Sequence, residues 1–221
     1  MGIHYGSFVD LLLIILVVGN VLLLGSSRLV TCIQISAVEG LVVTILTVAL
    51  HTGEIGVRVL ALALSSMLIK VGLFPWLLVR AVRVAHIKKE IEPIIGYAAS
   101  LIAGVFIIAL SLWLAARLPI PGKAANSFIL MVAFFTIFTG CFLIVSRTKA
   151  ITQVIAYLVL ENGVYLLGIP FVGEAHFLIE LGVFLDLTVG IFIMGIMIHQ
   201  INREFDSLDV KHLSQLSDWE S

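Results

Sequence analysis

The chain has 221 residues, of which 61% are hydrophobic and only 12% are charged, so almost every window of about 20 residues suits the hydrocarbon core of a bilayer. Its formal net charge is -1, with 13 Lys and Arg against 14 Asp and Glu, which supplies neither the basic surface that binds nucleic acid nor an acidic tail. Composition therefore predicts a polytopic membrane protein in contact with lipid and excludes a nucleic-acid partner.

Apolar runs follow one another along the chain, separated by short polar or charged segments. They predict helices over residues 8–25, 29–51, 56–80, 94–116, 126–146, 149–169 and 175–201. Strands are not expected, because open sheet edges cannot be satisfied in lipid and no run alternates with a period of two. The predicted fold class is all-α, with about seven transmembrane helices.

The first run is expected to remain in the protein as its first span. It lacks the positively charged start and the small-residue cleavage site of a secretory signal. Cytoplasmic loops of membrane proteins carry an excess of Lys and Arg. One side of the predicted helices receives Arg28, Arg80, Arg83, Lys88, Lys89, Arg147, Lys149, Arg203 and Lys211, and the other receives Arg58, Arg117 and Lys123. This distribution predicts an outside N-terminus and a cytoplasmic C-terminus, in a multi-pass protein of the inner (cytoplasmic) membrane.

A faint internal repeat divides the chain. The segments SRLVTCIQISAVEG and SRTKAITQVIAYLVLENG share Ser-Arg, a Gln six residues after the Arg, and a Glu within the apolar run that follows. The predicted organisation is a three-helix membrane unit over 1–93, a linking helix and loop over 94–125, a second three-helix unit over 126–202 and a cytoplasmic tail over 203–221.

Four ionisable residues interrupt the apolar runs at similar depth: Glu39, Lys70, Glu161 and Asp186. Each lies about 15–20 Å, at 1.5 Å per residue, from the polar or charged residue at the predicted cytoplasmic end of its helix. A single such residue is often a structural acid or half of a structural ion pair. Four of them near the middle of a core about 30 Å thick fit lateral proton transfer better, since each can exchange protons with the next through side chains or water.

Three further residues are predicted to support this row. Tyr157 and Tyr165 lie one turn to either side of Glu161, where their hydroxyls can bond the carboxylate or a water, although aromatic packing is the commoner role. Glu180 lies nearer the outer surface and is interpreted as an interfacial or proton-uptake residue. The chain has no metal-ligand cluster, glycine-rich phosphate loop or nucleophile-base pair, so no catalytic residue, cofactor site or metal site is predicted.

The stretches SRTKAITQVIAYLVLENGVYLLG and FLDLTVGIFIMGIMIHQINREFDSLD resemble the K-type subunit of complex I and the C-type subunit of Mrp antiporters. The whole chain resembles component E of hydrogenase-4. The resemblance implies a non-catalytic, cofactor-free subunit in the membrane arm of a complex I-like assembly, with antiporter-like subunits and a peripheral group 4 NiFe hydrogenase or related redox module as partners. It also implies that Glu161 and Asp186 are the two membrane-embedded acids of proton or Na+ transfer; Asp186 is shorter by one methylene than the family's Glu.

Two other readings remain open at the level of sequence. The chain can be an independent secondary carrier whose midplane charges bind an ion or substrate, which the faint repeat favours slightly. It can also be a structural spacer of an antiporter complex whose acids only fix helix packing. The absence of matched helices broken by Gly or Pro argues against the carrier.

Overall fold

The computed structural model describes residues 2–50, 64, 67–84, 95–118, 127–169, 189–191 and 194–195. The elements in this part of the chain are all helical, in agreement with the predicted class. They are α1 (Gly2–Gly25), α2 (Leu29–Ala49), the π-helix η1 (Leu68–Leu73), α4 (Phe74–Val84), α5 (Tyr97–Arg117), α6 (Ser127–Ser146) and α7 (Ala150–Gly168).

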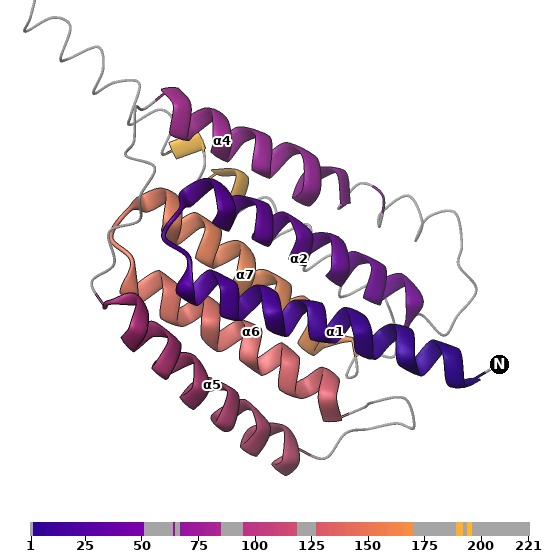
Figure 1. Cartoon of the computed structure of the whole chain (residues 1–221). Coiled ribbons are helices and arrows are strands. Elements are labelled where there is room, and N and C mark those ends of the chain that lie inside the picture. Colours follow the sequence, from indigo (N-terminus) through magenta and orange to yellow (C-terminus); the bar gives the residue numbers. More distant parts are fainter. Residues whose placement is uncertain are drawn as a thin grey trace, which may run out of the picture.

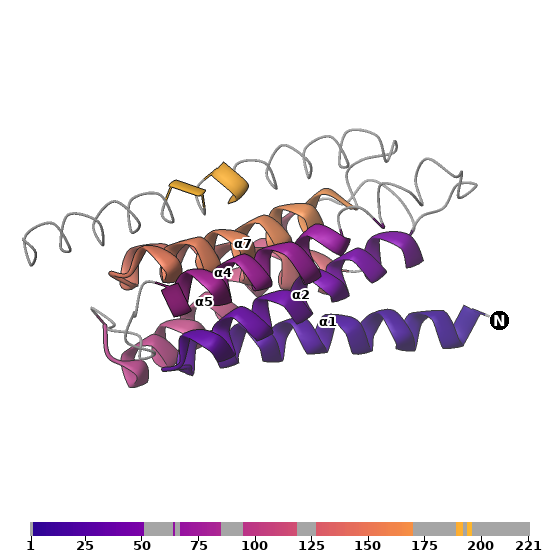
Figure 2. The ribbon, with the colours of Figure 1, turned by 90° about the horizontal axis from the view of Figure 1, so that it is seen from above.

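Four helices form the centre of the bundle. Contacts run from α1 to α2, from α2 to α7, from α7 to α6 and from α6 back to α1, so these helices close a ring in which α1 and α7 are diagonal. In Figure 2, α1 and α7 lie on opposite sides of α2. Helix α5 packs against α1 and α6, whereas η1 and α4 pack against α2. Helices α4 and α5 therefore lie on opposite sides of the bundle (Figure 1).

Five helices are long and apolar enough to cross a membrane, namely those over Gly6–Gly25, Leu29–Ala49, Tyr97–Arg117, Ser127–Ser146 and Ala150–Gly168. Their bounds lie within a few residues of the predicted ones, except that α1 begins at Gly2 rather than at residue 8. The predicted helix over 175–201 lies outside the described residues, apart from helical residues at 189–191 and 194–195.

The third predicted helix was placed wrongly at its C-terminal end. The sequence predicts that this helix ends at Arg80, and it counts Arg80 and Arg83 with the charges of the following loop, but both residues lie within α4, which continues to Val84. Arg80 remains exposed and places its guanidinium 5.4 Å from the ring centre of Trp76, one turn earlier. An arginine in the last turns of a helix can thus keep its charge at the surface while the helix continues.

Two groups of buried apolar side chains occupy opposite ends of the bundle. The first apolar cluster comprises Leu23, Leu24, Leu29, Cys32, Ile33, Phe74, Leu78, Ala81, Val82, Leu143, Ile151, Val154, Ile155, Ala156, Leu158, Val159 and Val189. The second apolar cluster comprises Leu12, Leu13, Leu16, Val42, Val43, Leu46, Ala115, Ile129, Leu130, Met131, Val132, Ala133, Tyr165 and Leu166. Each helix of the central ring contributes to both clusters, so the segment between them crosses the middle of the bundle.

Candidate functional site

The segment between the two apolar clusters carries buried polar side chains on each of the four central helices. We call this set, together with Lys70 of η1, the polar layer. Its other members are Asn20 on α1, Ser36 and Glu39 on α2, Thr136 and Thr139 on α6, and Glu161 and Asn162 on α7. All of these residues are at most 7% exposed. A polar band enclosed by apolar side chains on both sides is costly unless its members satisfy one another or bind a ligand.

The structure brings together Lys70 and Glu161, two of the residues that the sequence singles out. Lys70 Nζ lies 2.6 Å from Glu161 Oε1, and the two side chains are 6% and 0% exposed. The contact is an ion pair, yet the Glu161 oxygens accept no hydrogen bond of regular geometry from the described residues. Oε2, which is not in the ion-pair contact, therefore retains the capacity to accept a donor.

The π-helix sets the position of Lys70. Pro75 has no backbone N–H, and its ring would collide with the carbonyl of Val71 in a regular α-helix. The wider turn of η1 accommodates this ring, and the Phe74 N–H donates to Ile69 O, the residue five positions earlier. Such π-type turns frequently occur at functional sites, because they redirect a side chain by inserting one extra residue.

A glycine on α2 leaves room for the lysine. A Cβ atom added at Gly40 would lie 3.3 Å from Lys70 Cβ and 3.9 Å from Asn162 Oδ1. Lys70 thus passes along α2 toward α7, where the Tyr165 ring centre lies 5.3 Å from Nζ. The aromatic face adds a second favourable contact for the ammonium.

Two glycines hold α6 and α7 close together on either side of Glu161. A Cβ atom at Gly140 would lie 2.7 Å from Leu160 N, and one at Gly163 would lie 2.7 Å from Ile137 N. Neither position can carry a side chain without a backbone shift, and this close approach buries Glu161 and Asn162 completely or nearly so.

The predicted supporting tyrosines have different surroundings. Tyr165 belongs to the second apolar cluster and faces Lys70, whereas Tyr157 packs against the first apolar cluster. Glu39 lies in the polar layer but on the side of α2 that meets α1: a Cβ atom at Gly19 would lie 2.7 Å from Glu39 Oε1. The structure therefore separates the contacts of Glu39 from the Lys70–Glu161 ion pair. Asp186 and Glu180 lie outside the described residues.

The sequence reasoning missed the uncharged members of the polar layer. Asn20 Nδ2 donates to Leu16 O at 2.8 Å and to Thr136 Oγ1 at 3.0 Å, so it links α1 to α6. Asn20 could have been found from the sequence, since it is the one amide in the apolar run VVGNVLLLG. Asn162 could have been found in the same way, since it directly follows Glu161 in an apolar run. The sequence prediction considered only ionisable residues, because their burial costs more than that of neutral polar groups. The polar layer also contains neutral amides and hydroxyls.

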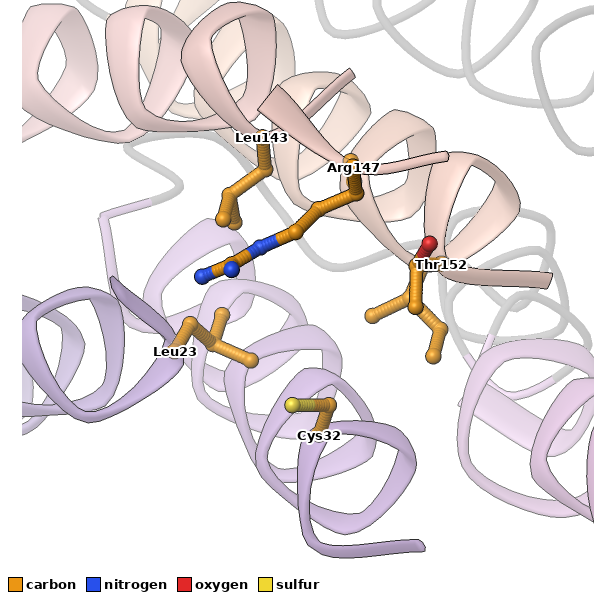
Figure 3. A pocket seen from close by; sticks show the side chains of 7 residues that line it. Leu23, Cys32, Leu143, Arg147 and Thr152 are labelled. Carbon is orange, nitrogen blue, oxygen red and sulfur yellow. The ribbon is translucent and has the colours of Figure 1, made fainter. Parts of the chain in front are cut away.

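A second buried cation lies near one end of the bundle. Arg147, between α6 and α7, is 2% exposed, donates from Nη2 to Leu24 O at 3.2 Å and stacks 5.3 Å from the Tyr97 ring centre. Its guanidinium borders a small pocket of about 10 Å³ (Figure 3), which accommodates at most one water molecule. Burial lowers the pKa of Arg147, whereas electrostatic interactions with Tyr97 and Cys32 raise it. The guanidinium lies at the C-terminus of α1, where a positive charge is favourable, and holds this helix against the segment between α6 and α7.

The described residues contain no group of three or more His, Cys, Asp or Glu side chains that could hold a metal ion.

Comparisons with known proteins give distant similarities. No family model matches the chain. No solved structure matches it. Uncharacterized protein Rv0085 of Mycobacterium tuberculosis is 24% identical over 206 residues, which cover 92% of this chain and 93% of that protein. Hydrogenase-4 component E of Escherichia coli and that of Shigella flexneri are each 26% identical over 154 residues, covering 69% of this chain and 70% of theirs. The chain is therefore a multi-pass membrane protein with distant similarity to hydrogenase-4 component E.

Proposed function

We propose that the chain is a membrane-arm subunit of a complex I-like, redox-driven assembly, such as a group 4 NiFe hydrogenase, and that its polar layer takes part in proton transfer. The observation that carries this proposal is the buried Lys70–Glu161 ion pair, enclosed between two apolar clusters in a bundle of membrane-length helices. The distant similarity to hydrogenase-4 component E supports the type of assembly. The chain itself holds no catalytic centre in this proposal.

The chemistry is an exchange of one proton within the pair. Transfer of a proton from Lys70 Nζ to Glu161 Oε1 converts an ammonium and a carboxylate into an amine and an acid, without changing the net charge of the pair. The neutral acid can then pass its proton to a neighbouring acceptor, and the amine can take another. A buried ion pair is suited to this exchange because both protonation states avoid an isolated charge.

The proposal extends to two other acids and to the placement of the chain. Glu39 is a further proton-carrying group of the polar layer, and Asp186 is the second acid of the K-type and Mrp C-type pattern. The subunit contacts antiporter-like membrane partners in the inner membrane, with its N-terminus outside and its C-terminus in the cytoplasm, next to the peripheral redox module.

Glu161→Gln tests the proton-transfer role directly. The amide keeps the size and polarity of the side chain but cannot ionise. We expect the complex to assemble, with lower stability than the wild type because Lys70 loses its counter-ion, and proton translocation to fall at least tenfold. Translocation is measured by quenching of a pH-sensitive dye in inverted membrane vesicles, with redox turnover followed in the same sample. Asp186→Asn is expected to have the same effect. The double substitution is expected to lower translocation little further, because a proton path through both acids in series is already interrupted by either single substitution.

Asp10→Asn on α1 is the matched control, since it makes the same acid-to-amide change outside the polar layer. Full translocation in a well-assembled Glu161→Gln complex would leave Glu161 as a structural acid and favour the spacer. A chain that is purified alone as a stable, transporting protein would instead favour the secondary carrier.

A further inference from the structure

The Glu39 carboxylate lies in a tight contact between α2 and α1. Glu39 is 1% exposed, and its Oε1 atom occupies the space that a side chain at position 19 would need, because a Cβ atom at Gly19 would lie 2.7 Å away. Gly19 is therefore the residue that admits the carboxylate to the surface of α1. Neither oxygen of Glu39 accepts a hydrogen bond from the residues that the structure describes.

Asn20, the next residue of α1, presents a second unsatisfied acceptor. Its Nδ2 group donates to Leu16 O, a carbonyl that can only accept, and this contact fixes the orientation of the side-chain amide. The same nitrogen donates to Thr136 Oγ1 of α6. The amide oxygen, Oδ1, is buried and accepts no hydrogen bond from the described residues.

The unsatisfied groups beside Gly19 are thus oxygen acceptors that need donors. Leaving a buried acceptor unpaired is costly, so such groups are normally bonded to protein or to ordered water. Asn20 Nδ2 cannot donate to Glu39, because its two hydrogens already form the bonds to Leu16 O and Thr136 Oγ1. A water molecule offers two O–H donors and is small enough to lie between closely packed helices.

We propose that Glu39 and Asn20 form a water-binding site where α1, α2 and α6 meet. The ligand is water, held by the Glu39 carboxyl group and by Asn20 Oδ1. The site lies next to the ion pair along α2, because Gly40 follows Glu39 and faces Lys70 and Asn162. Water here connects the polar-layer residue Glu39 of α2 with Asn20 of α1, which is itself bonded to Thr136 of α6. Its use in proton transfer rests on the proposed function, whereas the binding of water does not.

Single-particle imaging of the intact complex, at a resolution that shows ordered water, tests the site. We expect density within about 2.7–3.2 Å of a Glu39 carboxyl oxygen and of Asn20 Oδ1. Gly19→Ala displaces the carboxylate and Asn20→Leu removes the amide oxygen, so each is expected to abolish this density. Gly6→Ala, on the same helix with nothing within 4 Å of the added Cβ, is expected to preserve it.

The outcomes separate this site from the proposed function. Wild-type maps that show water elsewhere in the protein but none here would overturn the proposal. Density that is lost when choline replaces Na+ would also overturn it, because the site would then bind a cation. Neither result depends on translocation, which Glu161→Gln tests separately.

Discussion

Burial makes Lys70 and Glu161 depend on each other. Each is almost fully enclosed, and their charged atoms lie 2.6 Å apart, so either residue alone would be an uncompensated charge in an apolar surrounding. Such a pair need not stabilise the fold relative to two apolar residues, but breaking it is expensive. Substitutions that break the pair should therefore lower the stability of the subunit, and this effect can be measured separately from proton transfer.

Lys70→Met is expected to destabilise the subunit by about 3–5 kcal/mol, because it leaves Glu161 buried without its cation. Adding Glu161→Gln removes the stranded charge, and the double variant is expected to recover most of the loss. Thermal inactivation of the detergent-solubilised complex, compared across the two single variants and the double variant, measures this coupling. Additive losses would show that the two side chains do not act as a pair.

At the scale of the helices, small residues decide which elements approach each other. Gly140 and Gly163 bring the backbones of α6 and α7 into contact around Glu161. On α5 the buried positions Ser100, Gly104, Ile107, Ser111 and Ala115 recur every three or four residues, whereas Ile102, Val105 and Phe106 are about 70% exposed. A face of mainly small residues packs on the bundle, and the face of large apolar residues is suited to lipid.

Gly163→Ala is expected to destabilise the α6–α7 pair by about 1–3 kcal/mol, because the new methyl group would lie 2.7 Å from the backbone nitrogen of Ile137 and 2.8 Å from its Cγ1 atom. Gly6→Ala, where the added Cβ meets open space, is the control and is expected to be neutral or slightly stabilising. Melting temperatures of the purified complex provide the comparison. Equal melting temperatures for the two variants would mean that α6 and α7 are less closely packed than described.

Pro75→Ala tests whether the proline maintains the π-helix. With an N–H restored at position 75, a regular bond to Val71 O becomes available, and loss of the extra residue would rotate Lys70 by about 100° around the helix axis. We expect translocation to fall toward the level of Glu161→Gln. Leu73→Ala, at an exposed neighbouring position, should leave translocation unchanged. Normal activity in Pro75→Ala would indicate that the ion pair holds the wide turn without the proline.

Across the whole molecule, the described basic residues outside the polar layer are distributed unequally between the two ends of the bundle. Arg28, Arg80, Arg83, Arg147 and Lys149 lie at the end that holds the first apolar cluster, and Arg117 lies at the opposite end, beyond Ala115 of the second. The correction to α4 does not alter this distribution, because Ala81 and Val82 belong to the first cluster. The proposed cytoplasmic location of that end rests on this asymmetry, since cytoplasmic segments carry the excess of Lys and Arg.

Cysteine labelling tests this orientation. In a background with Cys32 and Cys141 replaced by Ala, Thr148→Cys and Leu118→Cys place single thiols at opposite ends of the bundle. We expect an impermeant maleimide to label Leu118→Cys in intact cells and Thr148→Cys only after the membrane is opened. Thiols at residues 85–92 and in the C-terminal tail should behave like that of Thr148→Cys. The opposite pattern would reverse the orientation, and labelling of both from one side would refute the bundle.

The sequence by itself determined the class of protein, the approximate bounds of the five described membrane-length helices and the common level of Lys70 and Glu161. Hydropathy is a local property, and the fixed rise per residue converts position in a helix into height, so Lys70 and Glu161 could be placed at one level before any packing was known. The same local rules failed at the C-terminal end of α4, where the charge of Arg80 and Arg83 did not end the helix.

Only the tertiary structure decided which of those residues meet. The direction of a side chain around its helix, and the helix that it faces, depend on packing between segments distant in the chain. Gly40 admits Lys70, Gly19 admits Glu39, and the wide turn before Pro75 sets the direction of the lysine. The pairing of Lys70 with Glu161 rather than Glu39, and the link from Asn20 to Thr136, follow from these contacts between helices, which height along a helix axis does not specify.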